Sequence, residues 1–204
     1  MQLKFLPSFV KRKGRITKKQ THSLSSLSEF SVKSIQEVED FSKHFYKCYL
    51  EIGFGNAENI IFQAINNPSY LFIGSEVYMS GIGTLVSSIK ENKINNIKIF
   101  SDDIRILLDQ SPKIVFDSVI IICPDPWPKE KHHKRRLINK SFLKMVHDFM
   151  NDDSNLYIST DWENYAESIS ESFEKNILFK PSSNKSFQKY SLSKFERRGK
   201  NEGR

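Results

Sequence analysis

Apolar residues gather in five short runs along the chain, separated by polar and glycine-containing segments. The runs cover residues 47–52, 70–77, 96–101, 115–123 and 155–160, and their length and content of Ile, Val, Phe and Tyr predict buried strands. Between the runs, apolar positions with helical spacing predict helices at residues 57–66, 79–91, 104–109, 140–150 and 162–175. This alternation predicts an α/β fold, a doubly wound and mostly parallel sheet with helices on both faces.

The two ends of the chain lack this alternation. Residues 1–45 combine a basic arm with a Ser-rich lead-in that is weakly helical near residues 31–45, so we expect one domain at 46–204 that ends in a basic tail. No apolar run reaches 18 residues, and the N-terminus has no signal-peptide core. Cys48 and Cys123 lie in apolar runs, which is typical of reduced core cysteines in a cytoplasmic protein.

The net charge of +7 is unevenly distributed. Segments 1–20, 129–140 and 180–204 hold 21 of the 31 Lys and Arg residues but only 3 of the 24 acidic residues. Basic blocks around an acidic body indicate a polyanionic partner, and we expect the three blocks to converge on one face. An anionic membrane is the weaker alternative, because none of the blocks shows a clear amphipathic helical face.

Glycines and carboxylates follow the first three predicted strands. Gly53 and Gly55 form the turn after the first strand, where glycine lets a ligand approach the backbone, although such turns also occur without any ligand. Glu76 ends the second strand 21 residues after Gly55, the spacing of an acidic residue that accepts both hydroxyls of an adenosine ribose. Asp102 ends the third strand, where a carboxylate can accept the adenine amino group.

The charge at this turn separates two nucleotide cofactors. Glu58 opens the next helix and would repel the pyrophosphate of a nicotinamide dinucleotide. S-adenosylmethionine carries an ammonium and a sulfonium instead, which Glu51 and Glu58 tolerate. The charges therefore favour S-adenosylmethionine.

The fourth predicted strand ends in Pro124-Asp125-Pro126-Trp127-Pro128. Three prolines in five residues cannot continue a helix or a central strand, so the chain leaves the sheet in a stiff turn. This turn presents Asp125 and Trp127 at the carboxyl ends of the strands, where open α/β sheets bind their ligands. A basic tract, residues 129–136, follows. Adjacent His132 and His133 cannot easily face one metal ion, so we predict no metal site.

These motifs together resemble the bacterial tRNA (guanine-N7)-methyltransferases over roughly residues 12–199. That family consists of Rossmann-like class I enzymes that transfer a methyl group from S-adenosyl-L-methionine to N7 of guanosine 46 in the tRNA variable loop. The resemblance implies a catalytic role for Asp125 and cofactor contacts at Glu51, Gly53, Gly55, Glu76, Asp102 and Asp125. It implies tRNA contacts at Lys129, Lys131, His132, His133, Lys134, Arg135, Arg136, Asp161, Ser193, Lys194, Phe195 and Glu196.

Three features depart from the family pattern. Ala57 stands at the third glycine of the cofactor turn, a change that we expect a helix N-terminus to absorb. Ser193 replaces a threonine and keeps its hydroxyl. The chain ends soon after Arg198-Gly199, where the family continues into one more strand, so we expect a C-terminal tail that is short for the family.

The implied reaction asks little of general acid–base catalysis. Guanine N7 carries a lone pair and no proton, so the attack needs no general base and depends on positioning, which contributes on the order of 7–11 kcal/mol in well-aligned systems. Asp125 is expected to accept hydrogen bonds from guanine N1–H and the N2 amino group and to favour the charge that develops on the ring. Trp127 fits a stacking platform and a buried wedge equally well. Asp161 fits a second base contact and an N-cap of the next helix.

The residues leave two other classes of protein open. An RNA-binding protein with a decayed cofactor pocket is suggested by Ala57 and the short C-terminus. A dinucleotide-dependent oxidoreductase is disfavoured by Glu58. For the quaternary state, a monomer and a homodimer both remain possible, and tRNA is the expected partner.

Overall fold

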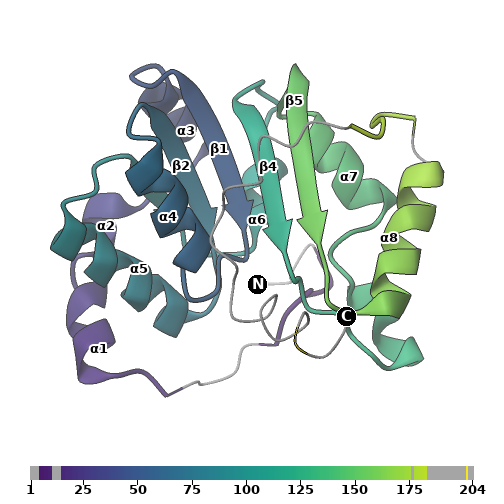
Figure 1. The fold of residues 1–204 in the computed structure, drawn as a ribbon, viewed down its shortest axis with the longest axis horizontal. Helices are drawn as coiled ribbons and strands as arrows, with labels where there is room; N and C mark the ends of the chain where they lie inside the picture. The colour runs from purple at the N-terminus through teal and green to yellow at the C-terminus, as the bar shows by residue number, and fades with distance from the viewer. Residues whose placement is uncertain (1–4, 11–14, 176, 183–200, 202–204) are drawn as a thin grey trace.

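The computed structural model describes residues 5–10, 15–175, 177–182 and 201, and it is built on a five-stranded sheet (Figure 1). The strands are β1 (Lys47–Ile52), β2 (Tyr70–Ser75), β3 (Ile97–Phe100), β4 (Phe116–Ile122) and β5 (Met150–Ser159). Their order is β3-β2-β1-β4-β5, and every neighbouring pair is parallel. The order reverses between β1 and β4, so the predicted doubly wound parallel sheet is confirmed.

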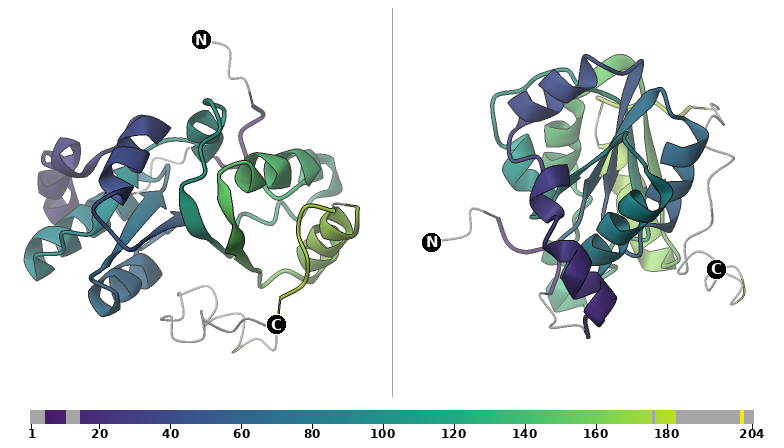
Figure 2. Two further views of the ribbon diagram at one scale, coloured as in Figure 1. Left: turned by 90° about the horizontal axis from the view of Figure 1, so that it is seen from above. Right: turned by 90° about the vertical axis from the view of Figure 1, so that its left-hand side faces the viewer.

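Helices cover both faces of the sheet, as the view from above shows (Figure 2). They are α1 (Lys18–Leu24), α2 (Leu27–Phe30), α3 (Ile35–Ser42), α4 (Glu58–Asn66), α5 (Met79–Asn92), α6 (Ile104–Leu108), α7 (Lys140–His147), α8 (Glu163–Glu174) and the short 3-10 helix η1 (Glu130–Arg135). Ile60 of α4 and Leu85 of α5 pack with Phe72 in one core layer. Helices α3, α6 and α7 form the other layer, which Tyr165 of α8 joins. Two buried layers around one sheet are the expected packing of this fold class.

The largest difference from the predicted elements is at the start of β5, which begins at Met150 rather than at residue 155. Phe116 pairs with Met150 while Ser118 pairs with Asn155, so an irregular register lengthens the strand. Asn151 Nδ2 donates to Asp117 Oδ1 over 3.0 Å and stabilises this irregular part. The first half of β5 was not predicted, because residues 151–155 are polar and lack the apolar pattern on which the prediction relied.

Helices α1 and α2 were not predicted, since we expected an arm and only a weakly helical lead-in. Thr17 and Gln20 form a capping box at the start of α1: Thr17 Oγ1 accepts from Gln20 N at 3.2 Å, and Gln20 Oε1 accepts from Thr17 N at 2.8 Å. The helix packs closely on α5, because a Cβ at Gly83 would lie 2.9 Å from Gln20 Cβ. Gln20 Nε2 also donates to Thr84 Oγ1 at 3.0 Å. Residues 17–20 of the basic arm are therefore part of the folded body.

No helix in the described ranges is long and apolar enough to span a membrane.

Candidate functional site

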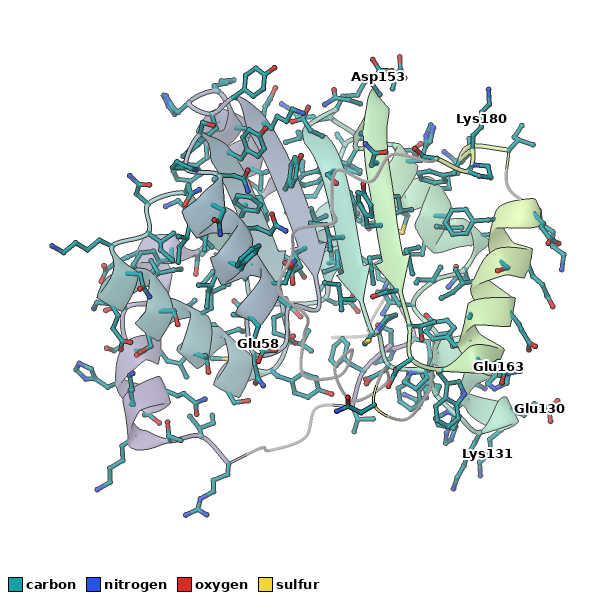
Figure 3. All side chains as sticks on the ribbon, viewed as in Figure 1. Glu58, Glu130, Lys131, Asp153, Glu163 and Lys180 are labelled. Atoms are coloured by element: carbon teal, nitrogen blue, oxygen red, sulfur yellow. The ribbon has the colours of Figure 1, made fainter. Side chains whose placement is uncertain are left out.

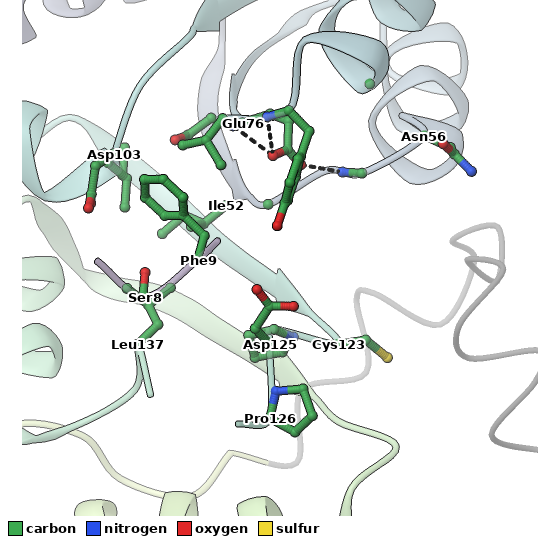
Figure 4. A pocket seen from close by; sticks show the side chains of 18 of the residues that line it. Ser8, Phe9, Ile52, Asn56, Glu76, Asp103, Cys123, Asp125, Pro126 and Leu137 are labelled. Atoms are coloured by element: carbon green, nitrogen blue, oxygen red, sulfur yellow. Dashed lines mark hydrogen bonds between the residues drawn. The ribbon is translucent and has the colours of Figure 1, made fainter. Parts of the chain in front are cut away.

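A cavity of about 560 Å³ lies at the carboxyl ends of the strands, where the strand order reverses (Figure 4). Its volume is in the range of small-molecule sites in proteins. The predicted residues that line it are Gly53, Gly55, Glu76, Asp102, Asp125 and Asp161. The structure thus brings together six predicted residues that follow five different strands.

The glycine turn after β1 has the left-handed backbone that its glycines permit. Gly53 has φ +74° and Gly55 has φ +54°, and Gly53 N donates to Ser75 O at 2.8 Å. Ala57 also has a positive φ, +66°, although it is fully buried and carries a side chain. The expectation that the helix N-terminus absorbs Ala57 needs this refinement: the helix begins at Glu58, and Ala57 precedes it in a conformation that L-residues rarely adopt.

Gly81, in the first turn of α5, is a site residue that the sequence analysis missed. A Cβ at this position would lie 2.1 Å from Gly55 O, so only glycine lets α5 approach the cofactor turn this closely. A glycine inside a predicted helix costs stability and often has a packing reason. The presence of Gly81 in the helix predicted at residues 79–91 was therefore a signal in the sequence for a close backbone approach.

Three backbone N–H groups hold the carboxylate of Glu76 in the cavity wall. Its Oε2 accepts from Gly55 N at 2.8 Å, and its Oε1 accepts from Val77 N at 2.6 Å and Tyr78 N at 3.0 Å. Burial raises the pKa of Glu76, the three hydrogen bonds partly offset this, and the charge of Asp125 adds to the rise. A carboxylate has about four acceptor directions. The backbone uses three of them, which leaves less capacity for ribose hydroxyls than the bidentate contact we expected.

The other two predicted carboxylates of the cofactor half differ in exposure. Asp102 is exposed in the cavity wall, and its Oδ1 accepts from Asp103 N at 2.8 Å. Glu51 is only 3% exposed, is not among the described residues that line the cavity, and accepts from Asn59 Nδ2 at 2.7 Å. Glu51 therefore supports the turn from behind, and its direct contact with a cofactor stays a prediction.

The turn after β4 contains two residues other than glycine with a left-handed backbone, Cys123 (φ +46°) and Trp127 (φ +47°). Asp125 lies between them and is exposed, with its carboxylate directed into the cavity (Figure 4). Unusual backbone conformations of this kind persist only where the surroundings hold them. The turn therefore holds Asp125 in a defined position.

Trp127 is a half-buried wedge in this structure. Its indole N–H donates to Ser8 O at 2.9 Å, and the Arg135 guanidinium lies 5.0 Å from its ring centroid. His132 packs edge-on at 5.6 Å. Of the two interpretations of Trp127, the geometry favours the wedge.

Residues 5–10 cross the cavity, and Ser8 and Phe9 line it. Side chains of four different loops or helices hold their backbone. The carbonyl oxygens of Leu6, Pro7, Ser8 and Val10 accept from Arg105, Arg135, Trp127 and Tyr78, respectively. This part of the basic arm is thus a wall of the site.

The basic tract divides into outward and inward residues. Lys129, Lys131 and Lys134 are exposed, whereas His132, His133 and Arg135 are half-buried. Burial and the neighbouring positive charges of Lys131 and Arg135 lower the pKa of His132, which favours the neutral form of its imidazole.

Arg136, which the resemblance implied as a tRNA contact, is buried. It is 5% exposed, and its guanidinium faces the protein: Nε donates to Pro126 O at 2.9 Å, and one terminal nitrogen donates to Asn164 Oδ1 at 2.7 Å. Such a side chain cannot reach a phosphate without leaving these partners.

Asp161 lines the cavity and is half-buried. The N-cap of α8 is Trp162, which makes no side-chain cap hydrogen bond, so the interpretation of Asp161 as an N-cap is wrong. The hydroxyl of Thr160 accepts from Trp162 N instead, at 3.3 Å.

The expected convergence of the three basic blocks stays a prediction, because only residues 180–182 and 201 of the third block are described. Lys131 lies at the carboxyl edge of the sheet, and Lys180 lies at its opposite end (Figure 3). The predicted tRNA contacts Ser193, Lys194, Phe195 and Glu196 are outside the described residues. Within the described ranges, no group of three or more His, Cys, Asp or Glu side chains is arranged to hold a metal ion.

Comparison with solved structures identifies the fold. An antibiotic-related methyltransferase is 20% identical, with a TM-score of 0.50 over 70% of this chain and 75% of that one. A precorrin-6y C5,15-methyltransferase from Geobacter metallireducens is 15% identical, with a TM-score of 0.51 over 82% of this chain and 76% of that one. Both support the Rossmann-like fold of class I methyltransferases.

Comparison with protein sequences identifies the family. A family model described as "Putative methyltransferase" matches residues 46–204. The tRNA (guanine-N(7)-)-methyltransferase of Wolbachia pipientis wMel is 34% identical over 84% of this chain and 78% of its own length. That of Legionella pneumophila strain Paris is 34% identical over 97% and 89%. The chain therefore belongs to the tRNA (guanine-N(7)-)-methyltransferase family.

Proposed function

We propose that this protein transfers the methyl group of S-adenosyl-L-methionine to N7 of guanosine 46 in the variable loop of tRNA. The observation that carries the proposal is the position of Asp125. Its carboxylate enters the same cavity as Glu76, and the exposed lysines of the basic tract follow it within nine residues. Cofactor, base and phosphates thus have adjacent sites of suitable charge.

The residues of the cavity fit S-adenosyl-L-methionine, which is the cofactor of the family. Gly53 and Gly55 let the ligand approach the backbone, and Glu76 and Asp102 offer acceptors for ribose hydroxyls and the adenine amino group. Glu58 in the first turn of α4 disfavours a pyrophosphate at that helix end. When bound, the cofactor supplies a methyl group on a positively charged sulfur.

Asp125 acts on the base rather than as a proton acceptor. Its ionised carboxylate accepts hydrogen bonds from guanine N1–H and the N2 amino group, which orients N7 toward the cofactor half of the cavity. The negative charge also favours the cationic purine that forms when N7 is methylated. Asp161, which lines the same cavity, is the second acceptor available to hold the base.

The exposed lysines Lys129, Lys131 and Lys134 contact tRNA phosphates in this proposal. Contacts to phosphate fix the register of the RNA without carrying information on its bases. The cytoplasmic location stays a prediction; the free cysteines Cys48 and Cys123 suit a reducing compartment.

An RNA-binding protein with a decayed pocket is the second candidate, suggested by Ala57. The geometry argues against this candidate. Ala57 has the positive φ of a glycine turn, and Glu76 accepts three backbone hydrogen bonds. Calorimetric titration with S-adenosyl-L-methionine separates the two: a decayed pocket would give no binding heat.

The direct test is methylation of tRNA by Asp125 variants. The unsubstituted protein, incubated with tRNA and labelled cofactor, should yield one methylated guanosine, which borohydride–aniline cleavage locates at position 46. Asp125→Ala and Asp125→Asn should each lower kcat on the order of a hundredfold or more, as for the loss of one hydrogen bond to a developing charge.

A matched control is Asp153→Asn, because Asp153 is exposed at the opposite end of the sheet (Figure 3). It should retain full activity. Near-normal turnover by Asp125→Asn would exclude the acceptor role, and cleavage at another nucleotide would exclude guanosine 46.

A further inference from the structure

Arg136 is the one member of the basic tract whose side chain is buried in the described structure. It follows η1 directly and donates through Nε to Pro126 O at 2.9 Å. Its two terminal nitrogens donate to Asn164 O at 3.3 Å and Asn164 Oδ1 at 2.7 Å. The guanidinium carbon lies 4.9 Å from the ring centroid of Tyr165. One planar group therefore joins the turn after β4 to the first turn of α8.

The chemistry of this contact suits arginine alone. The guanidinium is a rigid fork that donates in several directions at once and stacks on an aromatic face, whereas a lysine ammonium is a flexible point charge. All three hydrogen-bond acceptors are neutral oxygens. Burial of a cation among neutral partners costs free energy, so a purely local stabilising role would be better served by an apolar side chain.

The contact acts on Asp125 through the backbone. Pro126 follows Asp125 directly, and prolines at 124, 126 and 128 restrict the turn. Fixing the carbonyl of Pro126 therefore fixes the direction of the Asp125 carboxylate. The left-handed backbones of Cys123 and Trp127 on either side need such support.

The same contact also reaches the second carboxylate of the cavity. Asn164 lies in the first turn of α8, three residues after Asp161. Tyr165, under the guanidinium, accepts from Ile138 N at 3.0 Å and is fully buried. Arg136 thus ties the segments of Asp125 and Asp161 to one rigid point.

We propose that Arg136 is a positioning residue for methyl transfer: it sets the distance and direction of Asp125 relative to Asp161, and it does not contact tRNA phosphate. This inference rests on the function proposed above. It assigns to Arg136 a role different from that of Lys134, two residues earlier, although both belong to one basic tract.

The test compares Arg136→Lys with Lys134→Ala in the same assays. Arg136→Lys keeps the charge but cannot serve Pro126 and Asn164 together. It should lower kcat by about 10- to 100-fold, since small misplacements of reacting groups cost up to about a hundredfold. The KM for tRNA, the salt dependence of tRNA binding and the affinity for S-adenosyl-L-methionine should stay as in the unsubstituted protein. Lys134→Ala should show the reverse pattern: weaker tRNA binding with a flatter salt dependence.

A double substitution distinguishes positioning from general support of the fold. If Arg136 acts through Asp125, Arg136→Lys should add little further loss in the Asp125→Ala background, because coupled sites are not additive. Asn164→Ala removes only the Oδ1 acceptor and should give a smaller loss of kcat with unchanged KM. It carries the test if Arg136→Lys fails to fold.

Each outcome has one meaning. Full kcat in both Arg136→Lys and Asn164→Ala would overturn the positioning role while leaving the proposed function intact. A flatter salt dependence for Arg136→Lys would make it a phosphate contact and overturn the proposal. If the losses of kcat from Arg136→Lys and Asp125→Ala multiply in the double variant, Arg136 acts as structural support independently of Asp125, and the positioning role is overturned. No methyl transfer by the unsubstituted protein would overturn the proposed function itself, and the positioning role with it.

Discussion

The two halves of the site are built in different ways. In the cofactor half, backbone N–H groups hold Glu76, and the longest of these contacts joins residues 21 positions apart. In the substrate half, side chains hold backbone carbonyls over separations of 10 residues for Arg136 and Pro126, 119 for Trp127 and Ser8, and 128 for Arg135 and Pro7. The groups that hold Glu76 lie close to it in the sequence, whereas the substrate half is held by contacts between distant parts of the chain.

This difference predicts how each half responds to substitution. A change in the cofactor half should disturb the turn and the ligand together, because the same backbone groups serve both. A change in the substrate half should affect either the support of the turn or the binding of tRNA, but not both. The reason is that one set of side chains holds the turn and another set faces the solvent.

The largest effect is expected for Gly81→Ala in the cofactor half. The new Cβ would lie 2.1 Å from Gly55 O, and a backbone oxygen cannot swing aside as a flexible side chain can. Overpacking of this kind costs about 1–3 kcal/mol of stability. We expect no measurable binding of S-adenosyl-L-methionine in calorimetry and a lower midpoint of thermal unfolding.

The control for this substitution is Ser88→Ala on the same helix, which should leave both values near normal because alanine favours helix. Normal cofactor affinity in Gly81→Ala would show that the turn is less rigid than its contacts suggest.

Glu76→Gln should have the next largest effect. The amide nitrogen cannot accept the hydrogen bonds that the carboxylate oxygens take from Gly55 or from Val77 and Tyr78. An unsatisfied buried donor costs about 1–3 kcal/mol. Cofactor affinity should fall at least tenfold in calorimetry, while tRNA affinity in filter binding stays nearly unchanged. Equal losses of cofactor affinity and tRNA affinity would show that the two halves of the site do not act separately.

The two halves also differ in how far the sequence predicted them. Gly53, Gly55 and Glu76 follow their strands at fixed spacing, so the alternation of strands and helices was enough to place them in one cavity. Arg136 could not be assigned in this way. Its residue type and its neighbours are those of a phosphate-binding tract, and only the fold shows which of the charged side chains turns inward.

The missed features have a common physical cause. The docking of residues 5–10 depends on Arg105, Trp127 and other side chains far along the chain, and no local pattern reports such contacts. Helix α1 is different, because its capping box at Thr17 and Gln20 was readable in the sequence. The helix was not predicted because the high charge of residues 1–20 is typical of an unstructured arm.

A moderate effect is expected when Lys129, Lys131 and Lys134 are all replaced by Ala. These side chains are exposed and hold no part of the turn that the structure describes, so the protein should stay folded and bind the cofactor normally. The slope of log affinity for tRNA against log salt should flatten by roughly 0.7–0.9 for each tRNA phosphate that the variant no longer neutralises. Filter-binding titrations at several salt concentrations measure this slope.

The matched control replaces Lys43, Lys47 and Lys175, which lie at the amino end of the sheet, where α3 leads into β1 and α8 ends. It removes the same charge and should keep the slope. If both triple variants flatten the slope equally, the basic tract has no special place in tRNA binding.

The smallest effect is expected for Ala57→Gly, although Ala57 has the most unusual backbone of the cofactor half. Relief of its left-handed conformation favours glycine by about 1–2 kcal/mol. Two losses oppose this gain: one buried methyl group, worth about 0.8 kcal/mol, and the greater freedom of glycine in the unfolded chain, worth about 0.4–1 kcal/mol. The free energy of unfolding in urea should therefore change by less than about 1 kcal/mol. Ala57→Val is the contrasting variant, because a β-branched residue is strongly disfavoured at positive φ and should destabilise the protein clearly. A large gain in stability from Ala57→Gly would mean that the cofactor turn is strained as it stands, and the cofactor half would then resemble the substrate half in depending on outside support.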